Sequence, residues 1–152
     1  AWSGLDPIMA GTEIEDGNIL FYRNVDFNTY GFLNATEDFI ASDPESAQTI
    51  VDTYEYAREW ALANEDEAIQ ILADESGVTL ETARTVWERT NLDIDNVPGE
   101  AQRTVLTRVG PYLVESGDVA TQADVDSALG SLIHDSFATK ADPARISALV
   151  SE

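Results

Sequence analysis

The strongest constraint on the fold is a succession of amphipathic helix patterns that fills the sequence from residue 36 to its end. Asp43 and Pro44 mark a helix start, because an Asp side chain can cap free N–H groups and Pro suits the first helical position. Thr79 and residues 121–124 mark the starts of two further helices. In the helix that follows Pro44, the apolar positions recur at helical spacing: Ala47, Ile50, Val51, Tyr54, Ala57, Ala61 and Leu62.

Two short apolar segments near the start of the chain predict strands. Residues 19–22 (ILFY) form a continuous apolar run, which is typical of a strand buried on both faces. Residues 27–34 (FNTYGFLN) predict a second strand, in which Gly31 indicates a bulge or a close approach by another group. Two or three strands do not form a stable sheet alone, so we expect a partner chain or a segment absent from this sequence to supply the others. The pattern predicts a helix-rich α/β fold.

Acidic residues dominate the charge of the chain. The sequence has 29 Asp and Glu against 8 Lys and Arg, a net charge of −21. A nucleic-acid partner would need clustered basic residues, so we expect none. The acidic residues lie along helices that also carry apolar stripes, which indicates a solvated acidic surface rather than a disordered tail. The sequence has no Cys, which excludes disulfides, thiolate ligands and a Cys nucleophile.

The side chains that enzymes need for chemistry are scarce. His134 is the only His, and it lies on a predicted helix face beside Ile133. Residues 93–96 (DIDN) resemble the start of a calcium loop, but Pro98 stands at the sixth position, where such loops need Gly. The sequence contains no Gly-rich phosphate loop and no Ser-centred nucleophile elbow. We therefore expect neither an enzyme nor a metal or cofactor site.

Polar residues within strand-like, apolar surroundings are the candidates for a binding site. They are Trp2, Ser3, Asp6, Asn28, Thr29 and Tyr30. Burying an unpaired carboxylate is costly, so Asp6 is expected either to cap the helix that begins after Pro7 or to face a ligand. Both alternatives stay open on this pattern. Trp2 is either a core residue or an aromatic platform for a ligand.

Trp2, Ser3 and Asp6 belong to an ordered set of motifs that resembles a known family. The set comprises AWSGLDP at residues 1–7, GFL at 31–33, Phe39 ahead of DPE at 43–45, WALANEDEA at 60–68 and YLVESG at 112–117. In this order they resemble the C-terminal half of the solute-binding proteins of nitrate, sulfonate and taurine ABC importers. The resemblance covers roughly residues 1–138.

This resemblance implies a type II periplasmic-binding-protein fold, in which two lobes close on a solute. Residues 1–18 would then end the second lobe, and residues 19–28 would cross the hinge. Residues 29–140 would return to the first lobe as a mostly helical portion with two or three strands near its start, followed by a C-terminal helix or tail at 141–152. The N-terminal half of the same protein would be missing and would supply the rest of the sheet.

The resemblance also assigns roles to individual residues. Asp6 matches a residue that faces the solute, and in relatives that bind amino compounds such a carboxylate pairs with an ammonium group. Trp2 and the adjacent Ser3 would line the same site, and Thr29, Tyr30 and Gly31 would lie where the returning strand passes it. Leu5 stands where the family usually has a second Trp.

The function implied is that of an extracytoplasmic solute-binding protein, with the membrane permease of an ABC importer as its partner. The solute would be a small sulfonate, a taurine-like molecule or a related nitrogen or sulfur compound. With a net charge of −21, a zwitterionic, cationic or neutral solute suits Asp6 better than bare nitrate does. The alternatives are a relative that binds or synthesises a pyrimidine precursor of thiamine, or a helical dimerisation or interaction domain.

Overall fold

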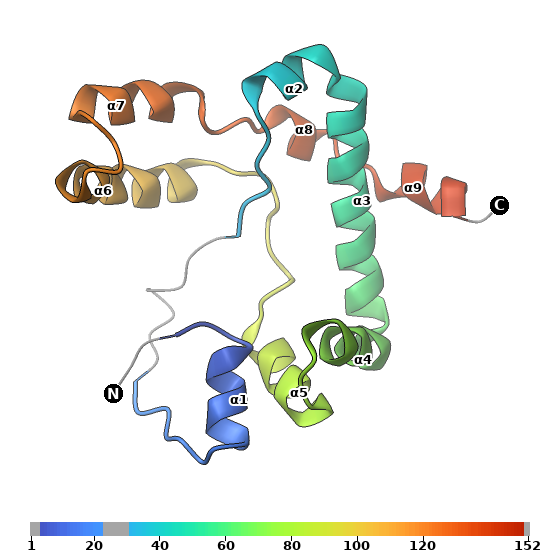
Figure 1. Ribbon diagram of the computed structural model, residues 1–152. Coiled ribbons are helices and arrows are strands. Elements are labelled where there is room, and N and C mark those ends of the chain that lie inside the picture. Colours follow the sequence, from blue (N-terminus) through green and yellow to red (C-terminus); the bar gives the residue numbers. More distant parts are fainter. Residues whose placement is uncertain (1–3, 23–30, 151–152) are drawn as a thin grey trace. The chain divides into compact units, whose positions relative to one another are not determined.

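All regular structure in the described part of the chain, residues 4–22 and 31–150, is helical in the computed structural model (Figure 1). The helices are α1 (Ile8–Ile14), α2 (Glu37–Ser42), α3 (Pro44–Ala63), α4 (Glu65–Ser76), α5 (Leu80–Arg89), α6 (Glu100–Ser116), α7 (Gln122–Ser131), α8 (Ser136–Thr139) and α9 (Pro143–Val150). Within these residues, no helix has the length and apolar character needed to cross a membrane.

The helix starts follow the predicted capping residues. The Thr79 side chain accepts a hydrogen bond from the Thr82 N–H at the start of α5, and the Thr121 side chain accepts one from the Asp124 N–H at the start of α7. The Asp43 carboxylate accepts a hydrogen bond from the Ser46 N–H as α3 begins. These three predictions are confirmed, and they rest on local hydrogen bonds that depend little on the rest of the fold.

The prediction of an α/β fold of the type II periplasmic-binding-protein kind is wrong for the described residues, because none of them forms a strand. In the run at residues 19–22, Ile19 is 84% exposed and Phe21 is 79% exposed, so no neighbouring strand covers them. Phe32 and Leu33, from the second predicted strand, are also exposed and lie in irregular structure. A short apolar run has high strand propensity, but it forms a strand only where a second strand pairs with it.

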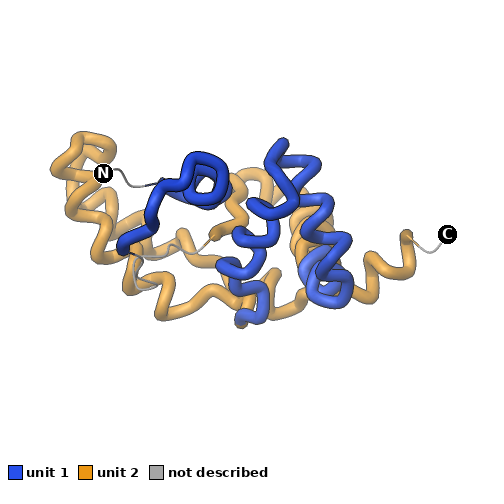
Figure 2. Tube along the Cα trace, turned by 90° about the horizontal axis from the view of Figure 1, so that it is seen from below, with its two compact units in different colours: residues 1–29, 57–94 blue, residues 30–56, 95–152 orange. Residues whose placement is uncertain are grey.

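The chain divides into two compact units, which Figure 2 shows in separate colours. Unit 1 contains residues 1–29 and 57–94, and unit 2 contains residues 30–56 and 95–152. The boundary between residues 56 and 57 falls within α3.

The core of unit 1 lies where α4 packs against α5. Ile69, Ala73 and Ala83 are buried together, and Leu72, Val78 and Trp87 pack around them. The small side chains of Ala73 and Ala83 allow close approach of the two helices, and the larger residues close the cluster. Helix α1 packs against the other side of α5, and its Ala10 is fully buried.

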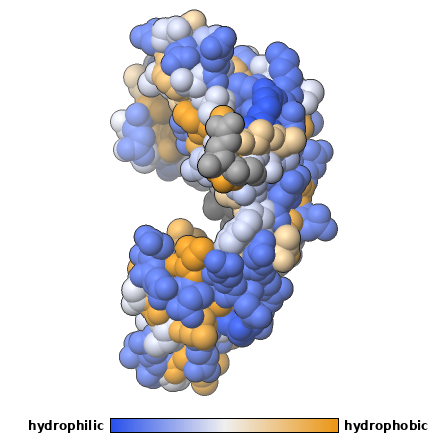
Figure 3. All heavy atoms as spheres, turned by 90° about the vertical axis from the view of Figure 1, so that its right-hand side faces the viewer, coloured by the Kyte–Doolittle hydropathy of each residue, from blue (hydrophilic) through white to orange (hydrophobic). Residues whose placement is uncertain are grey.

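In unit 2, α6 packs against α7 at a glycine. A Cβ atom built on Gly110 would lie 2.5 Å from Cγ1 of Val125, so only Gly allows this spacing. Elsewhere in the unit, Ala47 of α3 and Ile146 of α9 are buried. Many other apolar side chains of the described residues lie on the surface, and Figure 3 shows orange apolar residues among the blue hydrophilic ones.

Candidate functional site

Asp6 lies immediately before α1, and its carboxylate binds two donors. Its Oδ1 atom accepts a hydrogen bond of 3.0 Å from the Ala10 N–H, in the first turn of the helix. The same atom lies 3.5 Å from Nη1 of Arg89. Asp6 therefore satisfies a free backbone donor of α1, which is the capping role that the Asp-Pro pair predicts.

Arg89 comes from the last turn of α5 and joins that helix to α1. Its Nη2 atom lies 2.5 Å from Oε2 of Glu13, so one guanidinium group contacts two carboxylates seven positions apart in the sequence. The Glu13 carboxylate, which accepts this hydrogen bond, raises the pKa of Arg89 above its ordinary value. The Arg89 side chain is only 17% exposed, and this partial burial strengthens both ion pairs relative to pairs in open solvent.

A second polar link holds the same two helices together. The hydroxyl of Thr82, a fully buried residue of α5, donates a hydrogen bond of 3.3 Å to Oε1 of Glu15. Thr82 also bonds with Thr79, so its hydroxyl is satisfied on both sides. Together with Arg89, this contact fixes α1, and with it Asp6, relative to α5.

The geometry leaves one oxygen of Asp6 available. Both described contacts of the carboxylate use Oδ1, and no residue of the described ranges donates to Oδ2. The side chain of Asp6 is 25% exposed, so solvent can reach the carboxylate. The charges of Asp6, Glu13 and Arg89 sum to −1. Such a site accepts hydrogen bonds from a cationic donor such as an ammonium group.

The structure describes only one other residue predicted for the site. Gly31 lies in exposed irregular structure, and nothing lies within 4 Å of a Cβ atom built on it. It belongs to unit 2, whereas Asp6 belongs to unit 1. Trp2, Ser3, Thr29 and Tyr30 lie outside the described residues.

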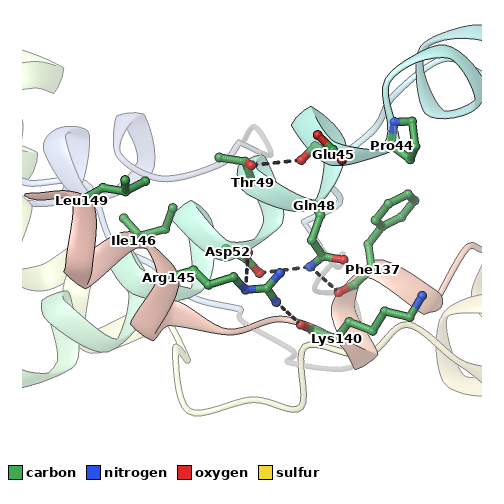
Figure 4. Close-up of a pocket in the computed structure, with 10 residues that line it drawn as sticks. All are labelled: Pro44, Glu45, Gln48, Thr49, Asp52, Phe137, Lys140, Arg145, Ile146 and Leu149. Atoms are coloured by element: carbon green, nitrogen blue, oxygen red, sulfur yellow. Dashed lines mark hydrogen bonds and ion pairs between the residues drawn. The ribbon is translucent and has the colours of Figure 1, made fainter.

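A pocket of about 470 Å³ in unit 2 was not predicted from the sequence. Figure 4 shows Asp52 of α3 at its centre, with Arg145 of α9 and Gln48 on either side. Oδ2 of Asp52 lies 3.1 Å from Nε of Arg145, and Oδ1 accepts hydrogen bonds of 3.0 Å from Nε2 of Gln48 and 2.9 Å from the Asp142 N–H. Gln48 also donates to the Phe137 carbonyl.

The polar groups at the floor of this pocket therefore bond with one another. The Asp52 side chain is 3% exposed, and the Lys140 ammonium group points away from it (Figure 4). No oxygen of the Asp52 carboxylate remains free for a ligand, because each accepts a donor from α8, α9 or their flanks. The network joins α3 to the C-terminal helices, whereas the Asp6 carboxylate keeps an open acceptor. We therefore take Asp6, Glu13 and Arg89 as the candidate site.

Sequence reasoning missed Arg89 and Glu13. A usable signal was present, because a chain with 8 basic and 29 acidic residues offers several carboxylates to each basic side chain. Arg89 ends α5, in which Ala83 and Val86 are buried. Which carboxylates it meets depends on how α1 packs, and no pattern in the sequence indicated that. Among the described residues, no group of three or more potential ligands could hold a metal ion.

Comparison of this chain with known proteins identifies no related protein. No protein-family model, no curated protein and no solved structure matches this chain. The resemblance to solute-binding proteins therefore rests on the motifs of the sequence itself.

Proposed function

We propose that this chain belongs to an extracytoplasmic solute-binding protein that delivers its solute to the permease of an ABC importer. The solute is a small sulfonate, a taurine-like molecule or a related nitrogen or sulfur compound. The ordered motifs between residues 1 and 138 support this proposal. The α/β architecture that the family resemblance implied is not part of it, because the described residues form no strand.

The observation that carries the proposal is the Asp6 carboxylate. It is held at the start of α1 by the Ala10 N–H and by Arg89, and no described residue donates a hydrogen bond to its Oδ2 atom. The side chain is 25% exposed, so a solute can reach it while part of the surrounding water is excluded. A charged hydrogen bond is stronger in such a partly buried position than in bulk water.

The charge of the chain favours a solute with a positive group. A net charge of −21 repels a bare anion at long range, although salt screens this repulsion beyond about 8 Å at physiological ionic strength. A zwitterion such as taurine has no net charge, and its ammonium group can donate to Asp6. Taurine is therefore a better candidate than nitrate.

A thermal-shift assay on the natural protein that contains this sequence tests the proposal. The panel comprises taurine, ethanesulfonate, nitrate and an aminopyrimidine. We expect taurine to raise the melting temperature, because a ligand that binds only the folded state stabilises it. Asp6→Ala should abolish this shift, whereas Asp16→Ala, an exposed acidic residue after α1, should leave it unchanged. No shift with any of the four compounds would refute the proposal.

A second candidate function, a helical association module, is favoured by apolar side chains on the surface of unit 2. Tyr112 is 70% exposed, Leu149 is 67% exposed and Tyr54 is 61% exposed. Sedimentation equilibrium separates the two candidates. A monomer at micromolar concentration would exclude the association module. A dimer whose melting temperature is not raised by any of the solutes would favour it.

A further inference from the structure

The chain contains a single Asn-x-Ser/Thr tripeptide, formed by Asn34, Ala35 and Thr36. An Asn followed two residues later by a hydroxyl side chain is the acceptor pattern for N-linked glycans, provided that the middle residue is not Pro. We propose that Asn34 carries an N-linked glycan. This inference rests on the proposed function, because lipid-linked glycans are transferred to proteins outside the cytoplasm.

The transfer joins the Asn34 amide to a sugar from a lipid-linked donor. Nδ2 of Asn34 forms a bond to C1 of the first sugar, while the bond from C1 to the pyrophosphate of the lipid carrier breaks. The carrier leaves as lipid pyrophosphate, and a carboxylate of the transferase takes the proton that the amide loses. Nothing is oxidised or reduced, so the step needs only the glycan donor and the transferase.

The Asn34 side chain is accessible to such a transferase. All residues from 31 to 36 are exposed and belong to no helix or strand. Figure 1 shows this segment as irregular chain that leads into α2. No residue of the described ranges bonds with the Asn34 side chain, and nothing lies within 4 Å of a Cβ atom built on Gly31. The amide is therefore available in the folded protein, on the kind of surface segment that modification requires.

The hydroxyl of Thr36 is accessible as well. Thr36 is extended, with φ −74° and ψ 150°, and its side-chain oxygen accepts a hydrogen bond of 3.2 Å from the Phe39 N–H at the start of α2. This bond uses a lone pair of the oxygen, so the hydroxyl hydrogen can still be donated. The two groups that define the acceptor pattern thus lie together on an exposed, irregular segment.

The other Asn residues of the chain provide a comparison. None of them is followed two positions later by Ser or Thr: Asn18, Asn24, Asn28, Asn64, Asn91 and Asn96. Asn91 is exposed like Asn34, but Leu92 and Asp93 follow it. Because Asn91 shares the exposure of Asn34 and lacks the hydroxyl, it separates the effect of the pattern from that of accessibility.

The test is tandem mass spectrometry of tryptic peptides from the natural protein, purified from fractionated cells of its own source. Cleavage after Arg23 and Arg58 releases the peptide of residues 24–58, in which Asn34 is the one Asn with this pattern. The fractionation also records whether the protein lies outside the cytoplasm.

Four variants made in the same cells locate the modification. Asn34→Gln removes the acceptor, and Thr36→Ala removes the hydroxyl. Thr36→Ser keeps both the hydroxyl and the cap of α2, so it separates loss of the pattern from loss of the cap. Asn91→Gln is the matched control at an exposed Asn.

We expect the peptide of residues 24–58 to carry a glycan in the unaltered protein, in Asn91→Gln and in Thr36→Ser, and to carry none in Asn34→Gln and Thr36→Ala. The unaltered protein decides the question even if a variant does not fold. An unmodified peptide from protein outside the cytoplasm overturns the inference alone, and so does a glycan that persists in Asn34→Gln. Protein found only in the cytoplasm overturns the proposed function as well.

Discussion

Replacing Asp52 by Ala should destabilise the attachment of the C-terminal helices to α3 by about 3 kcal/mol, the sum of the net contributions of three hydrogen bonds. The carboxylate is almost fully buried and binds Nε of Arg145, Nε2 of Gln48 and the Asp142 N–H at 2.9–3.1 Å.

The magnitude follows from the exposure of the three donors. Each bond to the buried carboxylate contributes about 1 kcal/mol net, and charge raises this figure. The side chain of Arg145 is 48% exposed, so water can solvate its guanidinium group once the bond to Asp52 is lost. The bond from Arg145 therefore contributes near the lower end of the range for charged groups. Asp52→Asn keeps an acceptor oxygen and loses the ion pair, so we expect about half of the effect.

The assay is urea denaturation followed by circular dichroism, with hydrogen exchange of peptides from residues 136–150 to locate the change. Asp126→Ala is the matched control, because Asp126 accepts a hydrogen bond of 2.9 Å from Gln122 with the same spacing as Asp52 and Gln48, but in an exposed position. It should cost less than about 0.5 kcal/mol. A loss below about 1 kcal/mol for Asp52→Ala would contradict the network argument, since it is smaller than a single bond to a buried charged group.

Two further predictions concern local packing and pH. Gly110→Ala should destabilise the α6–α7 contact by about 1–3 kcal/mol, because the new methyl group would overlap Val125. Gly130→Ala should stabilise α7, because nothing lies within 4 Å of a Cβ atom built on Gly130. Equal melting temperatures for the two variants would contradict this prediction. The hydrogen bonds from Ser46 lower the pKa of Asp43 in the folded state, so its stabilising effect is present above the unfolded pKa and is lost as the pH falls through the folded pKa. Asp43→Asn should therefore be less stable than the parent at about pH 6, and this difference should shrink as the pH falls below the ordinary pKa of Asp; a difference that does not change with pH would contradict the assignment.

The helices of this chain could be predicted because their signals are local. Thr79, Thr121 and Asp43 cap helices through side-chain bonds to N–H groups within three residues, which a sequence pattern specifies directly. Helical spacing accounts for the burial of Ala83 and Val86 in α5, but Leu80 at the same spacing is 46% exposed. Asn64 stands at the start of α4 but makes no capping hydrogen bond, because its side chain donates to the Trp60 carbonyl of α3.

The strands and the partners of Asp6 could not be predicted in the same way. The run at residues 19–22 has the composition of a strand, but pairing depends on a second strand that the described residues do not provide. Gly11 has a low helix propensity but lies within α1, where the neighbouring Ala10 is buried and the helix packs against α5. The contact of Arg89 with Asp6 spans 83 positions in the sequence, and it depends on tertiary packing.

A crystal structure of the natural protein with taurine tests the central claim most directly. The account predicts that the taurine nitrogen lies about 2.8 Å from Oδ2 of Asp6, the usual distance for a charged hydrogen bond, while Oδ1 keeps its bonds to Ala10 and Arg89. Taurine bound away from Asp6, or an Asp6 carboxylate whose two oxygens both bind protein donors, would contradict it.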